Sequence, residues 1–216
     1  MSKKIGVVLS GCGVFDGAEI HEAVLTLLSI QQNGAEAVMA APNRDQAHVL
    51  NHITGEEMDE TRNVLIESAR IARGKISDLA EVKADQLDAL VFPGGFGGAK
   101  NLCTFAFDGT AMSVDPEVER LVGEMREANK PIGFICITPA LGAKLVPGAT
   151  LTVGAGCDAS EAIEQMGATH VETDVASITI DDANNVVSTG AYMVGPWVAD
   201  VWKGIDALVT EVVSRA

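Results

Sequence analysis

The clearest candidate for a nucleophile in this chain is Cys136, because of its place in the sequence. The apolar run from Pro131 to Ile135 predicts a buried strand, and helix-forming residues resume near Thr138, so no loop separates strand from helix. This is the pattern of a nucleophile elbow, which holds a side chain above the first turn of a helix. Helix amides stabilise negative charge there, and such surroundings lower a cysteine pKa from about 8.5 to roughly 3.5 to 7.5. We therefore expect a thiolate, although a small residue ending a buried strand gives the same pattern.

The other thiols show no pattern of their own. Cys12, Cys103, Cys136 and Cys157 lie far apart and include no CxxC pair, which disfavours both a zinc site and a disulfide scaffold. We expect four reduced thiols and no bound metal.

The first half of the chain predicts alternating strands and helices. Lys4 to Ser10 is a continuous apolar run bounded by glycine, as in a strand covered on both faces. Apolar residues at helical spacing predict a helix from about Ala18 to Asn33, with Ile20, Ala23, Val24, Leu27 and Leu28 as its apolar stripe. A second strand follows from Ala35 to Ala41. The polar segment from Pro42 to Asp59 predicts a long excursion before a helix that begins near Glu60 or Thr61.

The second half continues this alternation. Leu87 to Phe92 predicts a strand, and the glycine-rich segment 93–98 after it would let backbone approach a ligand. Further helices are expected around 118–125, 138–145, 160–166 and 198–212, and further strands at 131–135, 149–153, 177–180 and 186–189. The DDANN segment at 181–185 predicts a hairpin turn.

Length and charge limit the classes of protein. A chain of 216 residues with 47% hydrophobic content fits one domain spanning residues 1–216. A net charge of -15 makes nucleic acids and anionic membranes poor partners. The amino end shows no signal peptide and no apolar run reaches membrane-spanning length, so we expect a cytoplasmic protein.

Five separated segments, GCGVFDGAEIHEA, NHITGE, ETRNVLIE, FPGGFGGAKNL and GFICITPA, resemble the ElbB-type glyoxalases of the PfpI and class I glutamine amidotransferase-like superfamily. The resemblance covers essentially the whole chain. It implies a flavodoxin-like three-layer α/β/α sandwich with a mostly parallel sheet, and a homodimer. It also implies cofactor-free conversion of small dicarbonyls such as glyoxal to the hydroxy acid, with Cys136 as nucleophile.

The same resemblance assigns the groups around the thiol. An acidic residue early in the chain reaches the cysteine in that superfamily, and the matching position here is Glu19; Asp16 has less support. Such a carboxyl would stay protonated and shuttle protons, although an acidic residue also simply favours a helix amino end. The backbone amides of Gly95 and Ile137 match the oxyanion donors. His21 and His52 are possible auxiliary bases, but histidines on a helix or in a polar loop are more often structural or solvated.

Two departures from the superfamily pattern narrow the chemistry. No histidine lies about twenty residues beyond the cysteine, where Cys157 and Asp158 stand instead, so glutaminase chemistry is disfavoured while thiolate addition to an aldehyde is not. Thr138 also replaces the glycine expected two residues after the nucleophile.

These observations favour a glyoxalase that needs no nicotinamide, metal or glutathione, since one carbon of the substrate is oxidised while its neighbour is reduced. Repair of early sugar-aldehyde adducts uses the same thiol chemistry, and the sequence does not separate the two activities. A redox or carbonyl-stress sensor without turnover, based on oxidation of Cys136, is the alternative from another class.

Overall fold

Residues 2–216, the part of the chain that the computed structural model describes, alternate between strands and helices. The strands are β1 (Lys4–Val8), β2 (Glu36–Ala41), β3 (Ser77–Asp78), β4 (Ala89–Phe92), β5 (Ile132–Ile135), β6 (Thr150–Leu151), β7 (Thr169–His170), β8 (Thr179–Asp181) and β9 (Val186–Thr189). The α-helices are α1 (Ile20–Gln32), α2 (Val64–Ile71), α3 (Phe96–Lys100), α4 (Phe105–Asp108), α5 (Pro116–Glu127), α6 (Pro139–Leu145), α7 (Asp158–Gln165) and α8 (Val198–Arg215). Short 3-10 helices are η1 (Leu79–Glu81), η2 (Ala84–Gln86), η3 (Gly109–Ala111) and η4 (Ala191–Met193).

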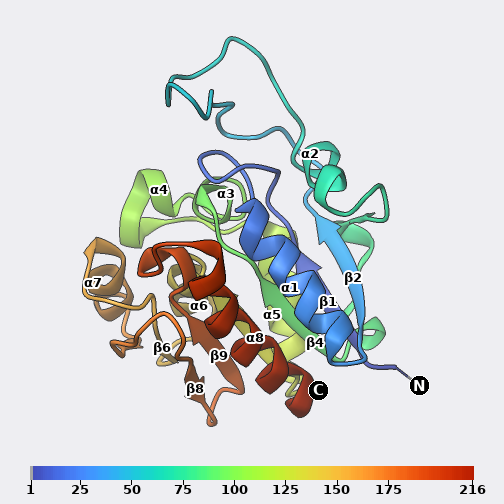
Figure 1. The fold of residues 1–216 in the computed structure, drawn as a ribbon, viewed down its shortest axis with the longest axis vertical. Helices are drawn as coiled ribbons and strands as arrows, with labels where there is room; N and C mark the ends of the chain where they lie inside the picture. The colour runs from blue at the N-terminus through green and yellow to red at the C-terminus, as the bar shows by residue number, and fades with distance from the viewer. Residues whose placement is uncertain (1) are drawn as a thin grey trace.

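A seven-stranded sheet runs between two layers of helices (Figure 1). Its strand order is β3-β2-β1-β4-β5-β9-β8, and neighbouring strands pair in parallel except β8 and β9, which form the predicted hairpin. β6 and β7 form a separate two-stranded sheet. The expected α/β/α sandwich with a mostly parallel sheet is confirmed.

The hydrophobic core has two parts, one on each face of the sheet. Successive side chains of a strand point to opposite faces, and β4 shows this directly. Ala89 and Val91 belong to the part that packs against α1 and α8. Leu90 and Phe92 belong to the part that packs against α5 and α6. Burial on both faces explains why the central strands are continuously apolar in sequence.

Several helices differ from the sequence-based expectation in their bounds. Helix α2 begins at Val64, later than expected, because the Asn63 side chain accepts a hydrogen bond from the Ile66 amide at 3.1 Å and caps it. The short helices α3 and α4 were not predicted, since a five-residue helix with two glycines carries no helical periodicity. Among residues 2–216, no helix combines the length and apolar character needed to cross a bilayer.

Helix α1 is rotated relative to the face that its apolar residues predict: Ala23 and Leu27 of the expected stripe do lie in or against the core. Ile20, Val24 and Leu28 are exposed, whereas Glu22, Thr26 and Ser29 are buried. The buried polar groups find partners: Thr26 Oγ1 donates to the Glu22 carbonyl at 2.7 Å, and Ser29 Oγ donates to Asp206 of α8 at 2.6 Å. The expected stripe is therefore right for Ala23 and Leu27 and wrong for Ile20, Val24 and Leu28, and the rotated helix brings a carboxyl into the core.

The polar segment between β2 and α2 is the expected excursion, and it extends away from the sandwich in Figure 1. Only isolated bridges, such as Leu50 with Glu57, give it regular pairing. Its base is held by side chains of the body: Asn101 Oδ1 accepts from the Ala47 amide at 2.9 Å. The segment is thus tied to the carboxyl edge of the sheet.

The close approach of α3 to the loop after β1 requires glycine at position 97. A Cβ at Gly97 would lie 2.5 Å from both the Gly17 Cα and the Ser10 carbonyl oxygen, neither of which can move as a side chain would. We expect Gly97→Ala to lower the free energy of unfolding by about 1–3 kcal/mol. Gly123 in α5 has open space around its Cα, so Gly123→Ala should raise it by about 0.5–1 kcal/mol.

Urea unfolding followed by circular dichroism measures both changes. An unfolding midpoint for Gly97→Ala equal to that of the parent protein would contradict this account of the packing.

Candidate active site

Cys136 occupies the sharp turn between β5 and α6. Its φ is 66°, in the left-handed region that non-glycine residues seldom adopt, and its amide donates to the Thr189 carbonyl of β9 at 2.9 Å. A strained conformation of this kind persists only where its surroundings hold it in place. The strand-to-helix turn predicted from the sequence is present.

Thr138 explains how the turn closes without the expected glycine. Its hydroxyl is buried and lies 3.0 Å from the Phe92 carbonyl of β4 and 2.9 Å from the Ile135 carbonyl of β5, to which it can donate. It also accepts from the Ile135 amide at 2.9 Å. The threonine therefore joins the carboxyl ends of the two strands beneath the elbow.

The carboxyl beside the thiol belongs to Glu22, in the first turn of α1. Glu22 is fully buried and hydrogen-bonds with Cys136. One of its oxygens accepts from the Gly94 amide at 2.9 Å and the other from the Tyr192 amide at 3.2 Å. A Cβ at Gly94 would collide with both Cys136 and the Glu22 carboxyl, so only glycine lets the two groups meet here.

Burial sets the ionisation of this pair. It raises the pKa of Glu22 to about 8, with the charge of Glu19 adding to the effect, so the carboxyl holds its proton at neutral pH. Burial, followed by the charge of Glu22, also raises the pKa of the Cys136 thiol well above its usual range. The amides of Gly95 and Ile137 act in the opposite direction but are outweighed. The expectation of a lowered thiol pKa is wrong because it counted the helix amides and not the burial.

Glu19 does not take the place expected for it next to the thiol. It is the N-cap of α1, and its carboxylate accepts from the Glu22 amide at 2.7 Å. Its backbone amide donates to the Gly94 carbonyl at 2.8 Å. The simpler alternative, an acidic residue that favours a helix amino end, is the geometry observed. Sequence reasoning missed Glu22, and the available signal was a second carboxyl three residues further along the same helix.

The two backbone amides singled out from the sequence do flank the sulfur. Both Gly95 and Ile137 place an N–H where it favours the anionic form of Cys136. Gly95 has a φ of 97°, and a Cβ there would collide with backbone of the loop before α1. The amides could hold negative charge on a substrate oxygen bound at the thiol. That role stays a prediction.

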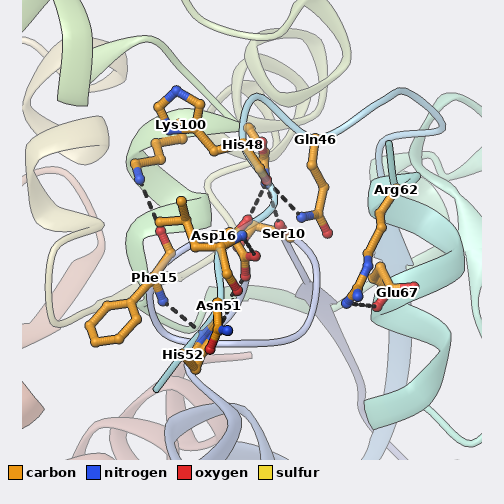
Figure 2. Close-up of polar contacts among 12 residues, drawn as sticks. Ser10, Phe15, Asp16, Gln46, His48, Asn51, His52, Arg62, Glu67 and Lys100 are labelled. Carbon is orange, nitrogen blue, oxygen red and sulfur yellow. Dashed lines mark hydrogen bonds and ion pairs between the residues drawn. The ribbon is translucent and has the colours of Figure 1, made fainter. Parts of the chain in front are cut away.

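The auxiliary candidates lie elsewhere. His52 and Asp16 anchor the excursion to the loop after β1 (Figure 2): the His52 ring accepts from the Phe15 amide at 3.2 Å, and Asp16 accepts from the Leu50 amide at 2.7 Å. His21 is half-exposed on α1, with Nδ1 2.8 Å from the Tyr192 hydroxyl. None of these three candidates is among the groups that shift the pKa of Cys136.

The position of the absent histidine is part of a cavity next to the elbow. Cys157 and Asp158 line this cavity together with Ile137. His170 lies instead on β7, where its Nε2 accepts from the Val153 amide at 3.3 Å. Within residues 2–216, no group of three or more histidine, cysteine or acidic side chains is arranged to hold a metal ion.

A mostly parallel sheet between helices, with a cysteine at a strand-to-helix elbow, defines an α/β protein of the class I glutamine amidotransferase-like fold. The chain belongs to the DJ-1/PfpI family, whose model matches residues 12–194. This confirms, at the level of the family, the resemblance seen in the sequence motifs.

Individual relatives are similar over nearly the whole chain. A human protein named glutamine amidotransferase-like class 1 domain-containing protein 3, mitochondrial, is 47% identical over 97% of this chain and 82% of its own length. A zebrafish (Danio rerio) ES1 protein, mitochondrial, is 34% identical over 96% and 84%. A crystal structure of an isoprenoid biosynthesis protein with amidotransferase-like domain from Ehrlichia chaffeensis has a TM-score of 0.91, 36% identity, and coverage of 99% and 100%. Two of these names include "mitochondrial", so they lend no support to the cytoplasmic location, which stays a prediction.

The pairing of Glu22 with Cys136 predicts how the thiol titrates. Because the charge of Glu22 raises the pKa of Cys136, Glu22→Gln should lower the pH at which the thiol becomes reactive. Glu19→Gln is the matched control, because the Glu19 carboxyl does not itself shift the pKa of Cys136. Its charge helps to raise the pKa of Glu22, so its loss favours ionised Glu22 and should not move the thiol titration to lower pH. The measurement is the rate of iodoacetamide alkylation of Cys136 against pH, read by peptide mass spectrometry.

A midpoint that stays in place or rises in Glu22→Gln would contradict the assignment. An equal downward shift in Glu19→Gln would show that a general loss of negative charge, and not the contact with the thiol, produces the effect.

Proposed function

We propose that this protein is a cofactor-independent glyoxalase that converts glyoxal to glycolate, and methylglyoxal to lactate, through a hemithioacetal on Cys136. The observation that carries the proposal is the contact of the thiol with a buried carboxyl, where the groups that shift the thiol pKa include no imidazole. A carboxyl can move protons on and off carbon. Amide hydrolysis by a thiol needs in addition an imidazole that protonates the poor amine leaving group. The site therefore favours a carbonyl substrate.

The first step joins the substrate to the enzyme. Once the pair has lost one proton, the Glu22 carboxylate accepts the thiol proton while the sulfur attacks the aldehyde carbon. The carbonyl electron pair moves onto oxygen, which the amides of Gly95 and Ile137 stabilise. Glu22 then gives its proton to that oxygen, and the product is a neutral hemithioacetal.

The second step moves hydrogen between the two carbons. Glu22 removes the proton from the sulfur-bearing carbon, and the electrons form an enediolate with the neighbouring carbonyl. Return of the proton to that neighbouring carbon, with transfer of the hemithioacetal hydroxyl proton to the enediolate oxygen, gives a hydroxyacyl thioester. Water hydrolyses this thioester to the hydroxy acid and the free thiol. One carbon is oxidised and the other is reduced, so no external electron carrier is consumed.

The same steps apply to an early sugar-aldehyde adduct, which extends the proposal to deglycation. The homodimer implied by the sequence resemblance stays a prediction. Its candidate surfaces are the excursion between β2 and α2 and the exposed apolar stripe of α1, formed by Ile20, Val24 and Leu28.

Three variants test the assignment of roles. Cys136→Ser should lower kcat/KM for glyoxal by about 10³-fold or more, because the nucleophile is lost. Glu22→Gln should lower it by about 10²- to 10⁴-fold, since proton transfer is lost while the thiol remains. Glu19→Gln should retain most of the turnover, because this carboxyl caps α1 and transfers no proton, and the rise of its activity should move to lower pH, because the charge of Glu19 helps to raise the pKa of Glu22. Glycolate formation measured by NMR gives the rates.

The parent activity should also rise as pH passes about 8, because Glu22 must be ionised to accept the thiol proton. Parent-level turnover in Cys136→Ser would sink the mechanism. Less than one turnover per subunit in the parent protein, with a stable modification of Cys136 seen by mass spectrometry, would favour the sensor instead.

A further inference from the structure

A cavity of about 950 Å³ opens beside the elbow. Its lining includes Phe96, Ile137 and Met193. Each of these directly follows in the chain a residue that belongs to the thiol and carboxyl pair or contacts it. Those preceding residues are Gly95, Cys136 and Tyr192. The cavity therefore lies beside the elbow, one residue along the chain from the thiol at Ile137.

The volume exceeds what a small dicarbonyl needs. Glyoxal has four heavy atoms and methylglyoxal five, while cavities of roughly 300–1,000 Å³ hold ligands of drug size. A substrate attached to Cys136 thus has room for a large group on the far side of its carbonyl carbons.

The walls of the cavity differ in character. Phe96, Phe105 and Met193 give it aromatic and apolar surface. Its carboxylates come from the end of α4, at Asp108, and from the first turn of α7, at Asp158 and Glu161. A substrate with an apolar body and a charged end would meet both kinds of surface in this cavity.

The carboxylates that line this cavity are not paired with a positively charged side chain of the described residues. Among residues 2–216, none of the ion pairs includes Asp108, Asp158 or Glu161, and no lysine, arginine or histidine lines the cavity. Lys100 lies over the Phe96 ring, 5.4 Å from its centroid, but it donates to the Phe15 carbonyl and belongs to a neighbouring, smaller cavity. The amino end of α7 offsets part of the charge of its two carboxylates.

We propose that this cavity binds the remote part of the substrate, and that the preferred substrates are 2-oxoaldehydes with an apolar body that ends in an ammonium or guanidinium group. The inference rests on the glyoxalase activity proposed above and adds the substrate class. Carboxylates in a concave site concentrate cations, and aromatic faces also attract them.

Three aryl glyoxals of matched frame test the charge preference: 4-(trimethylammonio)phenylglyoxal, phenylglyoxal and 4-carboxyphenylglyoxal. We expect kcat/KM to fall in that order, with a ratio of about tenfold or more between the cationic and the anionic substrate at low ionic strength. Added salt should reduce the ratio, because Asp108, Asp158 and Glu161 are exposed. Equal values for the three substrates would overturn the inference.

A charge-neutralising triple variant, Asp108→Asn with Asp158→Asn and Glu161→Gln, should bring the ratio close to one. The matched control is Glu36→Gln with Asp85→Asn and Glu127→Gln. It changes the net charge equally, but its positions begin β2, precede β4 and end α5, at the opposite edge of the sheet. An equal drop in both triple variants would assign the preference to the overall charge of the protein and overturn the proposal.

A thiol-labelling experiment separates failure of the inference from failure of the proposed function. Methanethiosulfonates form a disulfide with Cys136 and release methanesulfinate, so they need no turnover. The trimethylammonium-ethyl reagent should react faster than the sulfonatoethyl reagent, and the cavity triple variant should remove the difference, as read at the Cys136 peptide. If labelling shows this charge preference but no glyoxal is turned over, the cavity does prefer cationic ligands and the proposed glyoxalase function is wrong. If glyoxals are turned over but neither assay shows a charge preference, the glyoxalase function is supported and the proposed substrate class is wrong.

Discussion

The contact between the Glu22 carboxyl and the Cys136 thiol places the strictest demand on this fold, because two acids must be held together out of water. Four separate segments meet that demand. Helix α1 supplies the carboxyl, the loop after β4 and the turn after β9 supply amides to its oxygens, and the turn after β5 supplies the thiol. Isolation from water then raises both pKa values, which makes transfer of a proton between the two groups easier than its loss to solvent.

Backbone, more than side chains, builds this site. The groups that face the thiol and the carboxyl are amides of Gly94, Gly95, Ile137 and Tyr192, and the close packing around them explains the glycines after β4. Thr138 fixes the distance between the ends of β4 and β5 from below. Amides held in this way are oriented before a substrate arrives, which is the condition for electrostatic stabilisation of developing charge.

The sequence predicted most of the fold and part of the site. Apolar runs bounded by glycine identified the central strands, and the abrupt passage from Ile135 to Cys136 identified the elbow. The phase of α1 was not predictable from periodicity, because Ile20, Val24 and Leu28 resemble a buried stripe while Glu22 has partners visible only in three dimensions. The predicted lowering of the thiol pKa was wrong for a related reason. Helix amides are local and follow from the sequence, whereas burial depends on the whole fold.

The raised pKa of Glu22 also couples the site to the stability of the whole protein. At neutral pH an unfolded chain carries this carboxyl ionised, near its ordinary pKa of 4.5, while the folded chain holds it protonated up to about pH 8. Folding in that range therefore takes up a proton from solution. The associated stability is complete below pH 4.5 and is lost as pH rises through about 8, with a slope of about 1.4 kcal/mol per pH unit in between. The ionised form that could start a reaction is thus the form in which the native state is least favoured.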